Sequence, residues 1–176
     1  YTSRAALDTS AATKGDWNMA DDHPLHVLLI EDDEADAFVV GAHLSEPAVE
    51  SYRLTVAPTL AAAAPILAAS PPPDVVLLDL GLPDGRGAEN VSVLRSVSDA
   101  VPIVVITGAD DEALAYACID AGAQDFLWKG ELRATSLRRA IRHAVTRHRE
   151  SAERIGLERQ LREALTKALG GFVPIC

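Results

Sequence analysis

The stretch from Asp74 to Gly87 constrains the fold of this chain more than any other. Val75–Leu78 is a run of four apolar residues, two of them β-branched, which is typical of a strand buried on both faces of a parallel sheet. The run ends on Asp79, and the Pro and Gly residues that follow it predict a turn. A carboxylate is therefore expected at the carboxyl end of a central strand, the edge where open α/β sheets bind ligands.

Similar apolar runs recur along the chain and alternate with helical patterns. The predicted strands are His26–Ile30, Tyr52–Ala57, Val75–Leu78, Ile103–Ile106 and Gln124–Trp128. The predicted helices are Ala35–Leu44, Thr59–Ser70, Ala88–Val97, Asp110–Ala121 and a long one from Glu131 to about Leu169. Strands alternating with helices in this way predict an α/β fold, a doubly wound parallel sheet with helices on both faces and right-handed crossovers.

Apolar spacing also predicts which helix faces meet the core. In the first helix we expect Phe38, Val39, Ala42 and Leu44 to face inward, and in the third helix Val91, Leu94 and Val97. Pro65 inside the second helix is expected to distort one turn.

The length of 176 residues fits one domain with extensions. Residues 1–24 have no apolar period and are expected to be a mobile tail outside the fold. We expect the α/β domain at 25–147, a helical extension at 148–169, and a tail at 170–176 where a longer chain is interrupted.

Composition excludes several classes of function. The net charge of -10 argues against general nucleic-acid binding by the whole chain. No apolar run approaches the roughly 18 residues of a membrane helix, and no secretory signal is present. Cys118 and Cys176 lie far apart and form no metal or redox motif. We therefore expect a cytoplasmic protein without direct nucleic-acid or membrane contact.

Polar residues follow four of the five predicted strands. Glu31 and Asp32 follow the first strand, Asp79 the third, Thr107 the fourth and Lys129 the fifth. Because the carboxyl ends of parallel strands share one rim, these side chains are expected to converge. Carboxylate oxygens suit Mg²⁺, and a nearby Lys and hydroxyl complete a site for a tetrahedral oxyanion. The implied chemistry is phosphoryl transfer onto a carboxylate, with Asp79 as the nucleophile.

This ordered set resembles the receiver domain of response regulators in bacterial two-component signalling. The stretches that carry the resemblance are Val27–Asp33, Val75–Gly85, Val104–Gly108 and Ala121–Lys129. The resemblance covers about residues 25–147. It implies a flavodoxin-like five-stranded sheet in the order 2-1-3-4-5, a Mg²⁺ cofactor, and a sensor histidine kinase or phosphotransfer protein as the phosphodonor.

The resemblance also implies roles for single residues at the metal. Asp79 would be the phosphoacceptor. Asp32 and Asp79 would hold Mg²⁺, with Glu31 helping through water and the backbone carbonyl of Gly81 as a further ligand.

Three further roles concern the phosphoryl group. Lys129 would contact it, Thr107 would turn toward it, and Phe126 would be the aromatic switch that moves inward with Thr107. The chain departs from the family pattern where Gly130 replaces the usual Pro after the Lys, and where Phe126 replaces Tyr and so has no hydroxyl.

The long C-terminal helix has a heptad-like spacing. Two series share this spacing in shifted registers, with a break at Gly156: Ile141, Val145, His148, Ala152 and Ile155, then Leu157, Leu161, Ala164 and Ala168. Such spacing predicts a coiled coil and hence a homodimer. The alternative is one amphipathic helix that lies on its own domain.

Together these features predict a phosphorylation-activated receiver that signals by conformational change, dimerisation or partner binding, and that is not an enzyme acting on an external substrate. The alternative is a phosphorylation-independent scaffold or dimerisation module. An aspartyl phosphatase on a similar sheet is disfavoured, because those enzymes carry Asp-x-Asp and the third position here is Gly81.

Overall fold

The computed structural model of the protein describes residues 23–108 and 112–170. Its strands are β1 (Leu25–Ile30), β2 (Tyr52–Ala57), β3 (Val75–Asp79), β4 (Ile103–Thr107) and β5 (Asp125–Trp128). Its helices are α1 (Glu34–Ser45), α2 (Leu60–Leu67), α3 (Glu89–Val97), α4 (Glu112–Asp120) and α5 (Ala134–Gly170), with a 3-10 turn, η1 (Lys129–Glu131), after β5. The expected tails lie outside the described residues, apart from positions 23, 24 and 170.

The five strands form one parallel sheet in the order β2-β1-β3-β4-β5, as expected. β3 lies in the middle, paired with β1 on one side and β4 on the other. Asp79 is the last residue of β3 and lies opposite Ile106 of β4. The topology therefore places this carboxylate at the centre of the sheet's carboxyl rim.

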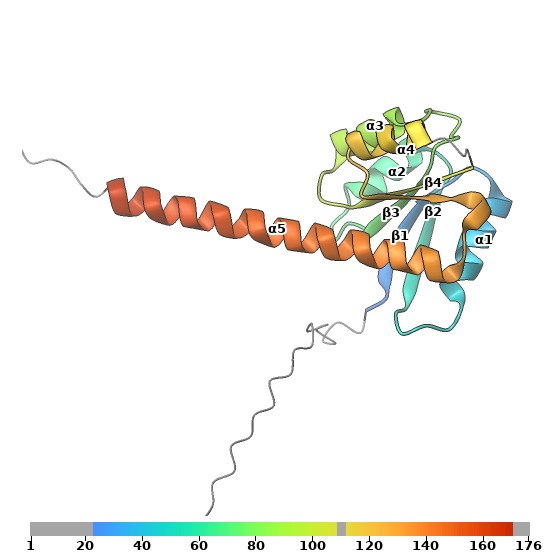
Figure 1. The fold of residues 1–176 in the computed structure, drawn as a ribbon, viewed down its shortest axis with the longest axis horizontal. Coiled ribbons are helices and arrows are strands. Elements are labelled where there is room, and N and C mark those ends of the chain that lie inside the picture. Colours follow the sequence, from blue (N-terminus) through green and yellow to red (C-terminus); the bar gives the residue numbers. More distant parts are fainter. Residues whose placement is uncertain (1–22, 109–111, 171–176) are drawn as a thin grey trace, which may run out of the picture.

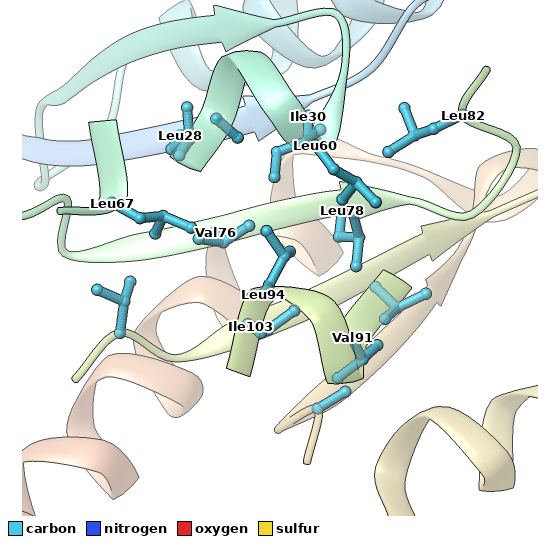
Figure 2. Packing of buried hydrophobic residues seen from close by; sticks show 14 of the residues in the cluster. Leu28, Ile30, Leu60, Leu67, Val76, Leu78, Leu82, Val91, Leu94 and Ile103 are labelled. Atoms are coloured by element: carbon cyan, nitrogen blue, oxygen red, sulfur yellow. The ribbon is translucent and has the colours of Figure 1, made fainter. Parts of the chain in front are cut away.

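Two apolar layers cover the sheet, because successive strand residues point to opposite faces. Val76 and Leu78 of β3 pack with α2 and α3, in the layer drawn in Figure 2. Val75 and Leu77 pack with α1 and α5 in the other layer. All five residues of β3 are buried, which explains why Val75–Leu78 is a continuous apolar run rather than an alternating pattern.

The prediction for α1 was largely wrong about which face is buried. Leu44 is buried as expected, but Phe38 is 77% exposed, Val39 is 44% exposed and Ala42 is exposed. The buried face instead contains Val40 and Leu44. Because α1 carries apolar residues around most of its circumference, periodicity alone does not determine which stripe meets the sheet.

Two other helices depart from expectation near their ends. α2 continues through Pro65 but ends at Leu67, three residues before the predicted end. In α3, Val91 and Leu94 are buried as predicted, whereas Val97 in the last turn is exposed where the helix leaves the core.

α5 has a part that packs on the sheet and a part that projects away from it (Figure 1). Leu137, Ile141 and Val145 are buried in the layer with α1. The coiled-coil prediction was therefore wrong for Ile141 and Val145, which pack on their own domain, as the alternative of an amphipathic helix requires. Leu157 and Leu161, farther along, are exposed.

Basic side chains tie the first part of α5 to the domain. Arg142 Nε lies 2.8 Å from Glu50 Oε1, and Arg149 Nη2 lies 3.3 Å from Asp74 Oδ1. Arg138 Nη2 donates to the backbone carbonyl of His43 at the end of α1, at 2.8 Å. Within the described parts of the chain, no helix has the length and apolarity that a membrane crossing requires.

Candidate functional site

The carboxyl rim of the sheet brings the predicted site residues together from four strands. Glu31 follows β1, Asp79 ends β3, Thr107 ends β4 and Lys129 follows β5. Strand alternation sorts these side chains by face. Glu31, Asp79 and Lys129 continue the face that packs against α1 and α5, whereas Thr107 continues the face toward α3 and α4.

Three carboxylates form a compact group on this rim. Glu31, Asp32 and Asp79 each offer an oxygen, and these oxygens lie within 4.8 Å of one another. Glu31 and Asp79 are buried, and Asp32 is exposed. An all-oxygen group that is open to solvent on one side fits a hard divalent cation such as Mg²⁺, which usually retains several water ligands.

The backbone after β3 fixes the orientation of Asp79. The backbone N–H of Gly81 donates to Asp79 Oδ2 at 2.9 Å. A Cβ at position 81 would lie 3.1 Å from the same oxygen, so glycine lets the backbone approach the carboxylate closely. The role of the Gly81 carbonyl as a metal ligand stays a prediction.

Lys129 joins the acidic residues through one ammonium. Its Nζ lies 2.8 Å from Glu31 Oε2, 2.6 Å from Asp36 Oδ2 and 3.1 Å from Asp79 Oδ1. Burial by itself would lower the pKa of Lys129. The hydrogen bonds to Asp36, Glu31 and Asp79 outweigh burial and raise that pKa above its ordinary value. Lys129 is therefore a fixed positive charge beside the Asp79 carboxylate.

Glu31 is held from two directions. Oε2 accepts from Lys129, and Oε1 accepts from the backbone N–H of Asp33 at 3.2 Å. Burial raises the pKa of Glu31, while the hydrogen bond from Lys129 opposes that rise.

Asp36 is the member of the site that the sequence analysis missed. It is the third residue of α1, and its backbone N–H donates to the N-cap carboxylate of Asp33 at 3.0 Å. Acids in a first helical turn have an ordinary explanation, because they interact favourably with the helix dipole. The pattern around Asp36 therefore indicated a helix start and gave no sign of the contact with Lys129.

Thr107 borders a cleft that also reaches Asp79. This cleft has a volume of about 560 Å³, and its lining includes Asp79, Gly81, Thr107 and Leu114. Thr107 is buried. The cleft therefore gives an approach to Asp79.

Phe126 and the turn after β5 frame the site. Phe126 is half-buried against the layer with α2 and α3, and its ring lies edge-on to Trp128 with centroids 5.4 Å apart. Among the described residues Ser70–Pro71 is the one cis peptide bond, so the Lys129–Gly130 peptide is trans. Lys129 thus reaches the site from a 3-10 turn without a Pro after it.

The loop after Asp79 is tied to α2 by Asp84, which the sequence analysis also missed. The Asp84 carboxylate accepts from the backbone N–H groups of Leu60 and Ala61, at 3.1 and 3.0 Å. The hydrogen bond from Ala61 is the main cause of a lowered Asp84 pKa. In sequence, an Asp before Gly indicated a turn, which concealed its capping of a helix more than 20 residues away.

Comparisons with known proteins agree with this geometry. Residues 27–142 match the family model described as the response regulator receiver domain. The chain is 40% identical over 126 residues to the KDP operon transcriptional regulatory protein KdpE of Escherichia coli (strain K12), covering 69% of this chain and 53% of that protein. It is 35% identical over 106 residues to the response regulator MprA of Mycolicibacterium vanbaalenii, covering 60% and 44%.

Solved structures show the same fold. The receiver domain of a LuxO repressor protein from Vibrio parahaemolyticus has a TM-score of 0.64 at 25% identity, covering 74% of this chain and 96% of that one. The receiver domain of an HD domain-containing protein from Pseudomonas fluorescens Pf-5 has a TM-score of 0.66 at 24% identity, covering 78% and 98%. The chain spans about half the length of the relatives matched by sequence.

Proposed function

This chain belongs to the family of response regulator receiver domains, and we propose from that premise that it is a switch activated by phosphorylation of Asp79. The observation that carries the proposal is the convergence of Lys129 with Glu31 and Asp79 at the sheet rim, beside an open cleft. The switch turns over no external substrate, and its chemistry is confined to gaining and losing its own phosphoryl group.

The proposed reaction is attack by a carboxylate oxygen of Asp79 on the phosphorus of a phosphohistidine. A P–O bond forms and the P–N bond breaks. The imidazole leaves with the bonding electron pair and takes up a proton. Lys129, at 3.1 Å from Asp79 Oδ1, is close enough to donate to the phosphoryl oxygens as charge develops on them.

The proposed cofactor is Mg²⁺, held by Asp32 and Asp79, with Glu31 acting through water and the Gly81 carbonyl as a further ligand. Bound there, it would neutralise charge on the phosphoryl oxygens. The proximity of the three carboxylates supports this assignment. Without a cation, Glu31 and Asp79 share the ammonium of Lys129, and Asp32 is not among its partners.

The proposed conformational response uses Thr107 and Phe126. Thr107 borders the cleft, so its hydroxyl is placed to turn toward a phosphoryl group on Asp79. Phe126, paired with Val105 in the sheet and half-buried, is proposed to move inward with it. This movement would change the surface formed by β5 when Asp79 is phosphorylated.

The proposed phosphodonor is a sensor histidine kinase or a phosphotransfer protein, and the proposed setting is the cytoplasm. The Escherichia coli relative is a transcriptional regulatory protein, and this chain spans about half of it. Even if that longer protein binds nucleic acid directly, the part that this chain matches need not do so. The absence of such binding here stays a prediction, as does the division into residues 25–147 and 148–169.

The phosphorylation test uses the protein with Mg²⁺ and acetyl phosphate. We expect the intact mass to rise by one phosphoryl group, and hydroxylamine, which cleaves acyl phosphates, to remove it. The gain should disappear when Mg²⁺ is chelated. If neither acetyl phosphate nor a phosphorylated histidine kinase produces the gain, the alternative of a phosphorylation-independent scaffold is favoured.

The projecting part of α5 is proposed to form a homodimer through its exposed apolar residues. These are Ile155, Leu157, Leu161 and Leu165. We expect light scattering to give a dimer mass, and the double variant Leu157→Gln and Leu161→Gln to give a monomer. The control is Glu163→Gln, which is exposed and lies three or four residues from none of these apolar side chains, and it should leave the mass unchanged. A wild-type monomer at all accessible concentrations, phosphorylated or not, would contradict the proposal.

A further inference from the structure

Asp36 holds the Lys129 ammonium more closely than the other two carboxylates do. The distance from Asp36 Oδ2 to Lys129 Nζ is 2.6 Å, against 2.8 Å for Glu31 and 3.1 Å for Asp79. The contact joins α1 to the turn after β5 across 93 positions of sequence. Asp36 is therefore part of the site, although it is not one of the three clustered metal-ligand candidates.

Each of the three N–H donors of the Lys129 ammonium has a carboxylate acceptor in this arrangement. A lysine ammonium has three N–H donors, and three carboxylates lie within hydrogen-bond distance of Nζ. A phosphoryl group arriving at Asp79 would need at least one of these donors. One existing contact must therefore lengthen or break as the phosphoryl group binds.

The longest contact, 3.1 Å, is with the acceptor Asp79 itself, and of the other two, exposure indicates which yields. The Glu31 side chain is 2% exposed, so losing its cation would leave a buried charge unpaired. The Asp36 side chain is 45% exposed and is solvated readily when released. Asp36 and the phosphoryl group are thus the two competitors for the same ammonium.

We propose that Asp36 is a positioning residue that draws the Lys129 ammonium toward α1 and thereby slows phosphorylation of Asp79. This inference rests on the proposed function. Phosphorylation of Asp79 is accordingly slower in the wild-type protein than in a variant that lacks the Asp36 carboxylate.

The reaction used for the test is phosphorylation by acetyl phosphate. An oxygen of Asp79 forms a bond to phosphorus, the P–O bond to the acetyl group breaks, and acetate leaves with the electron pair. The phosphoryl oxygens carry negative charge throughout, and Lys129 is their cationic partner from the protein. A more available ammonium is expected to increase the rate constant.

The first measurement compares Asp36→Asn with Glu34→Gln at saturating Mg²⁺, following intact mass against time. Both changes remove one negative charge from the first turn of α1, and Glu34 is not among the carboxylates that contact Lys129. We expect Asp36→Asn to be phosphorylated about threefold faster, and Glu34→Gln to remain close to the wild type. Asp36→Glu, which keeps a carboxylate, should remain within about twofold of the wild type.

The second measurement asks whether Asp36 acts through Lys129. In a Lys129→Met background, Asp36→Asn should give no acceleration. In metal-free protein, urea unfolding of Asp36→Asn, Lys129→Met and the double variant should show coupling between Asp36 and Lys129. The unfolding constant should deviate about two- to fivefold from the product of the single effects. The same cycle with Glu34→Gln in place of Asp36→Asn should show no coupling to Lys129.

Each outcome decides between the interpretations. An unchanged or slower rate in Asp36→Asn overturns the inference, as does an acceleration that persists without Lys129, because that would reflect charge alone. A wild-type protein that never gains a phosphoryl group overturns the proposed function and the inference with it. Phosphorylation of the wild type without acceleration in the variant overturns the inference alone.

Discussion

Asn in place of Asp79 is expected to abolish phosphorylation by acetyl phosphate and by a histidine kinase. The side chain keeps its shape, and its amide oxygen can still accept from the Gly81 N–H, so the fold should be retained. The amide is a far weaker nucleophile than the carboxylate. Intact mass after incubation with Mg²⁺ and acetyl phosphate measures the effect, and no phosphorylated species is expected.

The same variant is also expected to bind Mg²⁺ much more weakly, because one of the three clustered carboxylates becomes neutral. Titration of tryptophan fluorescence reports this, since Trp128 is adjacent to Lys129 in the chain. Loss of phosphorylation with unchanged Mg²⁺ affinity would place the cation elsewhere.

The matched control is Asp74→Asn, directly before the opposite end of β3. Asp74 accepts from the backbone N–H of His26 and pairs with Arg149, away from the rim. This variant should still gain one phosphoryl group. A phosphoryl gain in the Asp79 variant, or its loss in the Asp74 variant, would refute Asp79 as the acceptor.

Ala in place of Ile141 is expected to lower the free energy of unfolding by about 3 kcal/mol. Ile141 is fully buried between α5 and the sheet, in the layer that contains Leu77 and Leu137. Truncation removes apolar contacts and leaves a cavity that packed neighbours fill only in part. Urea denaturation of the wild type and the variant measures the difference.

The comparison variant is Leu161→Ala, on the projecting part of the same helix. Leu161 is exposed, so its truncation should change the free energy of unfolding by less than about 0.5 kcal/mol in dilute protein. Because dimerisation would add stability at higher concentration, both variants should be measured over a range of concentrations. An equal loss of unfolding free energy in Ile141→Ala and Leu161→Ala would contradict the division of α5 into a packed and a projecting part.

The outcome also bears on where the domain ends. Val145 is buried, and the ion pair from Arg149 to Asp74 is made just beyond it. Past that point the described side chains of α5 are mostly exposed. A large cost at Ile141 and a small one at Leu161 would support the predicted boundary near residue 147.

Much of the fold could be predicted from local sequence, because strands buried on both faces must be apolar throughout. Val75–Leu78 and Ile103–Ile106 follow this rule, and both are strands. The site was readable for a related reason, since parallel strands bring their carboxyl ends to one rim. Glu31, Asp79 and Lys129 therefore converge, although they are distant in sequence.

The sequence by itself thus determined the strands, their alternation with helices, and the carboxylates and lysine at the rim. Only the tertiary structure decided that α1 buries Val40 rather than Phe38, and that Asp36 reaches Lys129. The physical reason is that periodicity specifies that a helix has an apolar face but not how the helix rotates against its neighbours. That rotation follows from packing between residues far apart in the chain, and it determines which exposed acid joins the site.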